Sequence, residues 1–80
     1  MGMYKLDIRK QYGKFEHRVY KQKSDAPDHA GGDSDVHQLV TAVGASLDAT
    51  GVESKDTIVF RGIEYTNRDM LLFAVRDAPY

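Results

Sequence analysis

Cysteine is absent from this 80-residue chain, so neither disulfide bonds nor thiolate metal sites can stabilise its core. The chain also lacks any run of about 18 apolar residues, the length that a membrane span requires. Its first ten residues, MGMYKLDIRK, contain no apolar segment typical of a signal peptide. These absences predict a soluble, cytoplasmic protein with no membrane association. Internal repeats are absent too, and the length predicts a single domain over residues 1–80.

The charge of the chain is nearly balanced but unevenly distributed. Hydrophobic residues make up 41% and charged residues 29%, which is typical of a folded globular domain. Residues 1–23 hold seven basic and two acidic side chains, whereas residues 24–57 hold one basic and seven acidic ones. A basic start and an acidic middle would attract charged partners, or would face one another within the fold.

The segment 3–23 has the pattern of a β-hairpin. In YKLDIRKQY, apolar and polar residues alternate as in a half-buried strand, and FEHRVYKQK runs back after a glycine–lysine pair. Glycine at the first position of a two-residue turn predicts a type II′ hairpin. In that register Ile8 lies opposite Val19, and Arg9 lies opposite Arg18 on the other face.

A linker and a helix follow the hairpin. Residues 24–34 contain proline, paired glycines and short polar residues, which predicts a flexible linker. Apolar residues then recur with helical spacing from Val36 to Leu47, which predicts an amphipathic helix over residues 35–50. A serine or an aspartate is placed to cap its start, and a glycine is placed to end it.

The remaining residues predict a second hairpin over 57–77. TIVFRGIEYT and MLLFAVRD form its strands around the turn TNRD, and the change of alternation at Gly62 predicts a β-bulge. The expected fold is therefore α+β: a two-layer ββαββ domain with a four-stranded antiparallel sheet and one helix on one face. The expected core consists of Tyr4, Leu6, Ile8, Phe15, Val19, Val36, Leu39, Val40, Val43, Leu47, Ile58, Phe60, Ile63 and Leu72.

The expected last strand is apolar on both faces, and this feature supports our leading hypothesis about function. One helix covers only one face of a sheet, so the face carrying Leu71, Phe73 and Val75 is left over, and Val59 extends it. Contiguous exposed apolar surface marks an interface. We therefore expect a small non-enzymatic protein-binding module, inhibitor- or adaptor-like, that acts through a sheet face or edge, with self-association as one form of that contact.

Nucleic-acid binding is the alternative. Basic residues interleaved with an aromatic one on a sheet surface are a platform for single-stranded nucleic acid. The residues concerned are Lys5, Arg9, Lys14, Arg18, Tyr20, Lys21 and Lys23. Most charged strand faces are merely solvated, and Asp7 and Glu16 partly neutralise this one. An isoelectric point near 6.3 is also low for a nucleic-acid reader.

The stretch DHAGGDSDVHQ, residues 28–38, holds the candidate metal ligands His29, Asp33, Asp35 and His37. Their spacing matches no metal motif, and aspartates near a helix start are explained by the helix dipole. The glycines lack the spacing and the lysine of a phosphate-binding loop. We therefore expect no metal site and no cofactor.

Catalysis has little support in the sequence. The three histidines fit no familiar order of nucleophile, base and acid. His17 lies among the apolar positions of its strand, which indicates a partly buried histidine, and a lone general base would still need a pocket. We expect no enzyme, with a metal-dependent activity as the remaining alternative.

Overall fold

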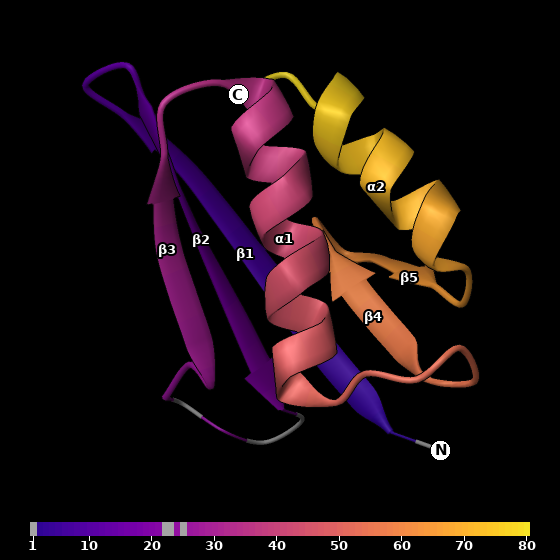
Figure 1. Cartoon of the computed structure of the whole chain (residues 1–80). Helices are drawn as coiled ribbons and strands as arrows, with labels where there is room; N and C mark the ends of the chain where they lie inside the picture. Colours follow the sequence, from indigo (N-terminus) through magenta and orange to yellow (C-terminus); the bar gives the residue numbers. More distant parts are fainter. Residues whose placement is uncertain (1, 22–23, 25) are drawn as a thin grey trace.

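Five strands and two helices follow one another in a computed structural model, which describes residues 2–21, 24 and 26–80 (Figure 1). In chain order they are β1 (Met3–Gln11), β2 (Lys14–Lys21), β3 (His29–Asp33), α1 (Val36–Thr50), β4 (Thr57–Phe60), β5 (Ile63–Tyr65) and α2 (Arg68–Asp77). The protein is a small α+β domain, as the sequence predicts, but it has one strand and one helix more than expected.

The strands form one mixed sheet in the order β3-β2-β1-β4-β5. Neighbouring strands are antiparallel except β1 and β4, which run parallel. The helix α1 brings the chain from the end of β3 back to the end of the sheet at which β3 begins. The next strand, β4, therefore runs in the same direction as β3 and β1. The expected four-stranded antiparallel sheet is wrong because a third strand precedes the helix and reverses this direction.

The first hairpin turns one residue earlier than predicted. Tyr12 and Gly13 both have positive φ, 54° and 75°, as a type I′ turn requires. Ile8 consequently lies opposite His17 and not opposite Val19. The shift equals two residues of register, so each side chain keeps the face of the sheet that the alternation predicts. Residues 22 and 23, the expected end of the hairpin, lie outside the described residues.

The expected linker over residues 24–34 contains the strand β3, so its assignment as wholly flexible is wrong; residue 25 lies outside the described residues. The sequence HAGGD has no apolar alternation to reveal a strand. Pairing with β2 forms it: Gly31 lies opposite His17 and Asp33 opposite Phe15. Tertiary backbone hydrogen bonding therefore outweighs the low strand propensity of glycine here.

The predicted helix over residues 35–50 is confirmed as α1. Asp35 is its N-cap and its side chain accepts from the Gln38 N–H at 2.9 Å. Gly51 ends it with a φ of 89°, a left-handed conformation that glycine adopts without strain. The apolar stripe contributes three buried residues, Leu39, Val43 and Leu47.

The expected second hairpin over 57–77 is wrong in its second half. The chain turns at Arg61 and Gly62, which have φ of 54° and 81°, so a tight turn replaces the expected bulge. The segment MLLFAV belongs to the helix α2. Asn67, expected in a turn, is the N-cap of α2 and its side chain accepts from the Met70 N–H at 3.2 Å.

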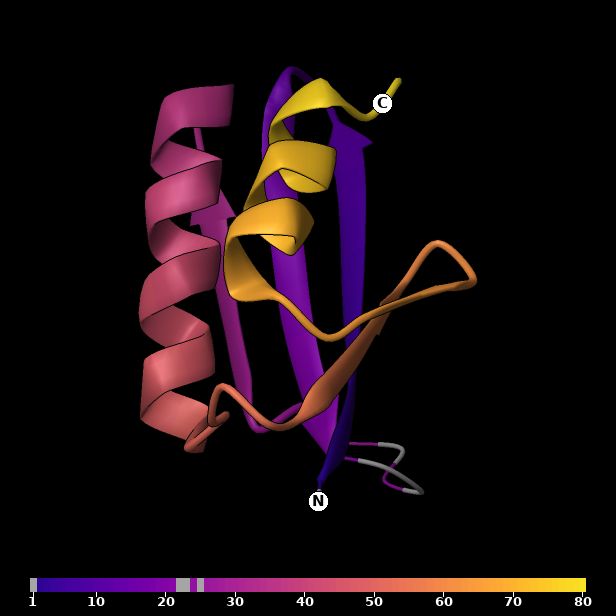
Figure 2. The same ribbon diagram turned by 90° about the vertical axis from the view of Figure 1, so that its right-hand side faces the viewer.

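Both helices cover the same face of the sheet, as Figure 2 shows, and the core lies between the two layers. Most of the expected core is confirmed, since these members are buried: Leu6, Phe15, Val19, Leu39, Val43, Leu47, Ile58 and Phe60. Tyr4, Ile8, Val36, Val40 and Leu72 are half-buried. The assignment of Ile63 to the core is wrong: its side chain is 56% exposed, because the short β5 lies at the sheet edge. Among the residues that the structure describes, no helix lies on the second face of the sheet.

Candidate functional site

A carboxylate, an imidazole and a hydroxyl meet under the helical layer, contributed by β3, β2 and α1. His17 Nδ1 lies 3.2 Å from Asp33 Oδ2, and His17 Nε2 lies 2.8 Å from Ser46 Oγ. The His17 residue is 2% exposed. Because a carboxylate oxygen only accepts, Nδ1 donates to Asp33. We call these three residues the histidine cluster.

Two features of the sequence build the histidine cluster. His17 occupies a position of β2 that faces the helices, as its place among apolar residues predicts. Gly31 lies directly opposite, and a Cβ at this position would lie 2.8 Å from His17 Cε1. The glycine therefore leaves the room that the imidazole ring occupies. Sequence reasoning missed the cluster, because its three members come together only once β3 pairs with β2.

The order of the three groups resembles that of a hydrolase triad, but their surroundings differ. Ser46 lies in the middle of α1, where the neighbouring backbone N–H groups are bonded within the helix and cannot stabilise an oxyanion. The cluster satisfies the polar atoms of a buried side chain. Across the residues that the structure describes, every buried side-chain nitrogen and oxygen has a hydrogen-bond partner. It therefore fastens β2, β3 and α1 together.

The four candidate metal ligands do not converge. Asp33 is held by His17, and Asp35 caps α1. His29 stands four residues before Asp33 on an extended strand, about 13 Å away along the chain. His37 lies in the first turn of α1. Among the described residues no group of three or more histidine, cysteine, aspartate or glutamate side chains is placed to hold a metal ion.

The basic residues of the first hairpin mostly share the sheet face that carries no helix. Lys5, Arg9, Lys14, Arg18 and Tyr20 occupy alternate positions on that face. Lys21 points to the other face, with Nζ 3.3 Å from Asp28 Oδ2, and Lys23 lies outside the described residues.

Acidic residues interleave with these bases. Arg9 lies opposite Glu16, not opposite Arg18 as expected, and Arg18 lies opposite Asp7. Tyr20 is only 8% exposed, and the Lys5 ammonium lies 4.7 Å from the centre of its ring. A covered aromatic ring offers no surface on which a base can stack, which weakens the case for nucleic acid.

The structure separates the four expected interface residues. Leu71 and Val75 are 0% exposed, one helical turn apart on the face of α2 that packs into the core. Phe73 lies on the outer side of α2 and is 55% exposed. Val59 is half-buried on the sheet face without helices. The sequence predicted a common face because we expected a strand, whose side chains repeat every two residues. In the helix α2 they repeat every 3.6 residues instead.

Phe73 instead borders a groove between α1 and α2. The groove has a volume of about 300 Å³ and is lined by Val40, Asp69, Leu72, Phe73 and Arg76. The Arg76 guanidinium lies 4.9 Å from the centre of the Phe73 ring. Met70, on the outer side of α2, is 62% exposed. The capping asparagine before MLLFAV was the sequence signal that could have identified this helix and hence the groove. We call it the interhelix groove.

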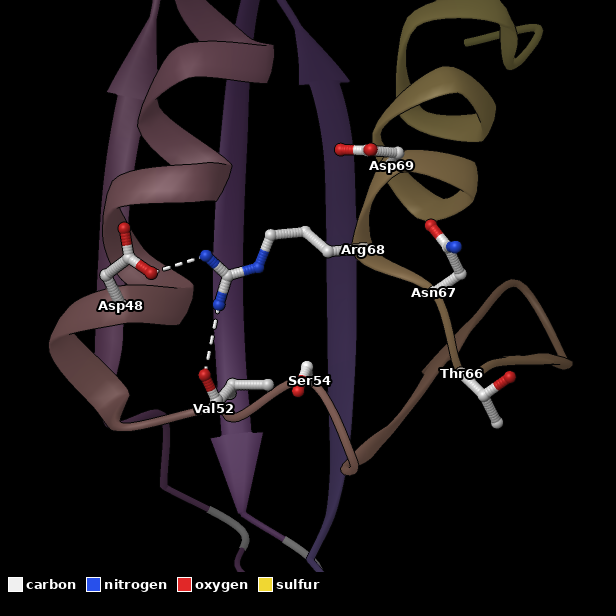
Figure 3. Close-up of a pocket in the computed structure, with 7 residues that line it drawn as sticks. All are labelled: Asp48, Val52, Ser54, Thr66, Asn67, Arg68 and Asp69. Carbon is white, nitrogen blue, oxygen red and sulfur yellow. Dashed lines mark hydrogen bonds and ion pairs between the residues drawn. The ribbon is translucent and has the colours of Figure 1, made fainter.

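A second, polar pocket of about 480 Å³ lies where α1 ends and α2 begins (Figure 3). Its lining consists of Asp48, Val52, Ser54, Thr66, Asn67, Arg68 and Asp69. Arg68 reaches from α2 to the Asp48 carboxylate, and its Nη2 donates to the Val52 carbonyl oxygen at 3.0 Å. These two bonds engage the Arg68 guanidinium, and they connect α2 with the end of α1.

Comparisons with protein-family models, with curated proteins and with solved structures gave no match to this chain. Neither helix of the described residues is long and apolar enough to cross a membrane.

Proposed function

We propose that this protein is a small non-enzymatic protein-binding module that holds a partner in the interhelix groove. The observation that carries the proposal is the exposure of Phe73 beside that groove, at 55%. An exposed aromatic side chain next to an apolar depression gains free energy when a partner covers both. The inhibitor- or adaptor-like role and the cytoplasmic location expected from the sequence belong to the same proposal.

The charges of the groove indicate what kind of segment fits. Asp69 and Arg76 lie seven residues apart on α2, about two turns, and both line the groove with Leu72 and Phe73 between them. An amphipathic helix suits such a groove between two helices. Its apolar face would carry one large side chain, with a basic residue near Asp69 and an acidic residue near Arg76.

The other two classes have less support. The histidine cluster lacks oxyanion donors, and the bases on the open sheet face alternate with acids. Nucleic-acid binding through Lys5, Arg9 and Arg18 therefore stays a prediction of the sequence.

Selection of displayed helical peptides against the purified chain tests the proposal. We expect enriched peptides to share one large apolar residue with a base on one side and an acid on the other. Their affinity, measured by fluorescence anisotropy, should fall at least tenfold in Phe73→Asp, because a buried carboxylate replaces the aromatic contact.

Tyr12→Asp is the matched control, since Tyr12 is 95% exposed on the far hairpin turn. Its affinity for the selected peptides should equal that of the unchanged chain. Peptides that bind Phe73→Asp as tightly as the unchanged chain, or a selection that enriches none, would overturn the proposal.

A further inference from the structure

The strand β3 forms an outer edge of the sheet, and within the described part of the chain it pairs with β2 alone (Figure 1). Proteins usually protect such an edge with lysine, proline or a bulge, because its outward N–H and C=O groups are available to another strand. The sequence HAGGD contains neither lysine nor proline. Ala30 and Gly32 are exposed and small, so their side chains leave the backbone accessible.

Gly32 is not required by the packing within one chain. A Cβ at this position would lie 3.8 Å from the Phe15 carbonyl oxygen, an ordinary contact, whereas at Gly31 it would collide with His17. Glycine inside a strand weakens it and often marks a place where another backbone approaches closely. Gly32 therefore fits a position at which a neighbouring strand lies along the free edge.

The sequence of β3 is complementary to itself when it is paired antiparallel. If two copies meet at Gly31, His29 of each copy lies opposite Asp33 of the other, and Ala30 lies opposite Gly32. Both His29–Asp33 pairs lie on the sheet face that carries the helices. The His29 imidazole and the Asp33 carboxylate, which His17 also contacts, therefore face each other across the two-fold axis, and small residues face small residues.

We propose that this chain associates with a second copy of itself through β3, so that the two sheets become one. The interhelix groove is a different surface, so this inference is independent of the proposed function.

The position of α1 is compatible with this arrangement. Its Ser46 touches His17 on β2, and its Asp48 touches Arg68 on α2. Helical periodicity then places Ala42 and Ala49 on the flank turned away from α2, above the free edge. Two α1 helices, each above β2 and β3, would lie about 10 Å apart, twice the strand spacing. That is a normal helix-packing distance, and alanine permits it.

Sedimentation equilibrium of the full chain over a concentration series tests the inference. We expect the mass to rise from the 9.0 kDa of one chain toward twice that value. His29→Asp should raise the dissociation constant about tenfold, because each substitution creates two facing aspartate pairs. His29→Lys should leave the dimer intact or tighten it, because lysine carries a full positive charge opposite Asp33.

Two α1 variants test the same interface without altering β3. Ala49→Glu should also raise the dissociation constant about tenfold, because it places like charges on the facing flanks of the two α1 helices. Thr41→Glu, on the solvent side of the same helix, is its control and should leave the dimer unchanged. Circular dichroism melting checks that each variant is folded.

Phe73→Asp should not affect the dimer, which separates this inference from the proposed function. A strict monomer at the highest concentration would overturn the inference. A dimer that is lost in Phe73→Asp but kept in both His29→Asp and Ala49→Glu would overturn it as well.

Discussion

His17 constrains the side chains that its neighbours can carry. Its buried imidazole has a partner on each nitrogen, and losing either would leave a buried polar atom unsatisfied, at a cost of about 1–3 kcal/mol. Gly31 is part of the same unit, because any Cβ there would occupy the space of the ring. Three positions therefore depend on one another: His17 on β2, Gly31 on β3 and Ser46 on α1.

The two adjacent glycines of β3 give a matched test of this dependence. Gly31→Ala should lower the free energy of unfolding by about 1–3 kcal/mol, since the ring must move away from at least one partner. Gly32→Ala should change it by less than about 0.5 kcal/mol or raise it, because its nearest contact is ordinary and alanine restricts the unfolded chain. Urea denaturation at low protein concentration measures both, and equal effects would contradict the role assigned to Gly31.

The helix α2 forms because its capping residue, its terminal charges and the spacing of its apolar residues all favour a helix. Asn67 caps its start, Asp69 lies in the first turn and Arg76 in the last, so both charges complement the helix dipole. Leu71 and Val75, four residues apart, are then directed into the core. The apolar run that resembled a strand with two buried faces is a helix with one.

The N-cap of α2 is open to direct test. Asn67→Ala should lower the free energy of unfolding by about 1 kcal/mol, because the Met70 N–H loses its acceptor. For a domain of this size that corresponds to a fall of about 4–8 °C in melting temperature. Asn67→Asp, which keeps a capping oxygen, should melt close to the unchanged chain. A similar loss in both variants would show that the side-chain cap is not the cause.

The beginning of the chain is joined to the loop before β4 by one carboxylate. Asp56 accepts from the Gly2 N–H at 2.7 Å and from the Glu53 N–H at 2.8 Å. These backbone hydrogen bonds lower the pKa of the Asp56 carboxyl from its usual value, because they stabilise the charged form. The parallel pair β1–β4 is thereby closed at one end.

Tyr80 joins the helical layer to the sheet at the other end of β1. Its hydroxyl donates to the Val75 carbonyl oxygen at 2.7 Å, and its ring packs edge-on against Phe15 with 5.2 Å between ring centres. Burial raises the pKa of the Tyr80 phenol to about 12, and the nearby Arg61 partly opposes this rise.

This pKa predicts a loss of stability in alkali. Below the ordinary tyrosine pKa of about 10 the phenol is neutral in both states, and its contribution is fully present. Between pH 10 and about 12 the unfolded chain loses the proton first, so stability falls as pH rises. Tyr80→Phe should show a shallower fall over that range in urea denaturation, because it removes this titration. A fall of equal slope in both proteins would contradict the burial of Tyr80.

Local patterns were reliable where neighbouring residues alone define the structure. The helix over residues 35–50 was predicted with its cap and its stripe, because Asp35, Gly51 and the spacing from Val36 to Leu47 act within one element. The alternation of the first hairpin predicted the correct faces even though the turn was misplaced by one residue. MLLFAV failed because a short apolar run fits both periods, and the deciding residue, Asn67, lies outside it.

The amino-acid sequence by itself therefore predicted a small α+β domain with a basic hairpin and a capped helix, and it identified most of the buried core residues. These features depend on residue spacing and on backbone preferences that act over a few positions. Only the tertiary structure decided that HAGGD is a strand, that β1 and β4 run parallel, and that His17 meets Asp33 and Ser46. Each of these depends on backbone pairing between distant segments, which leaves no periodic trace in the sequence.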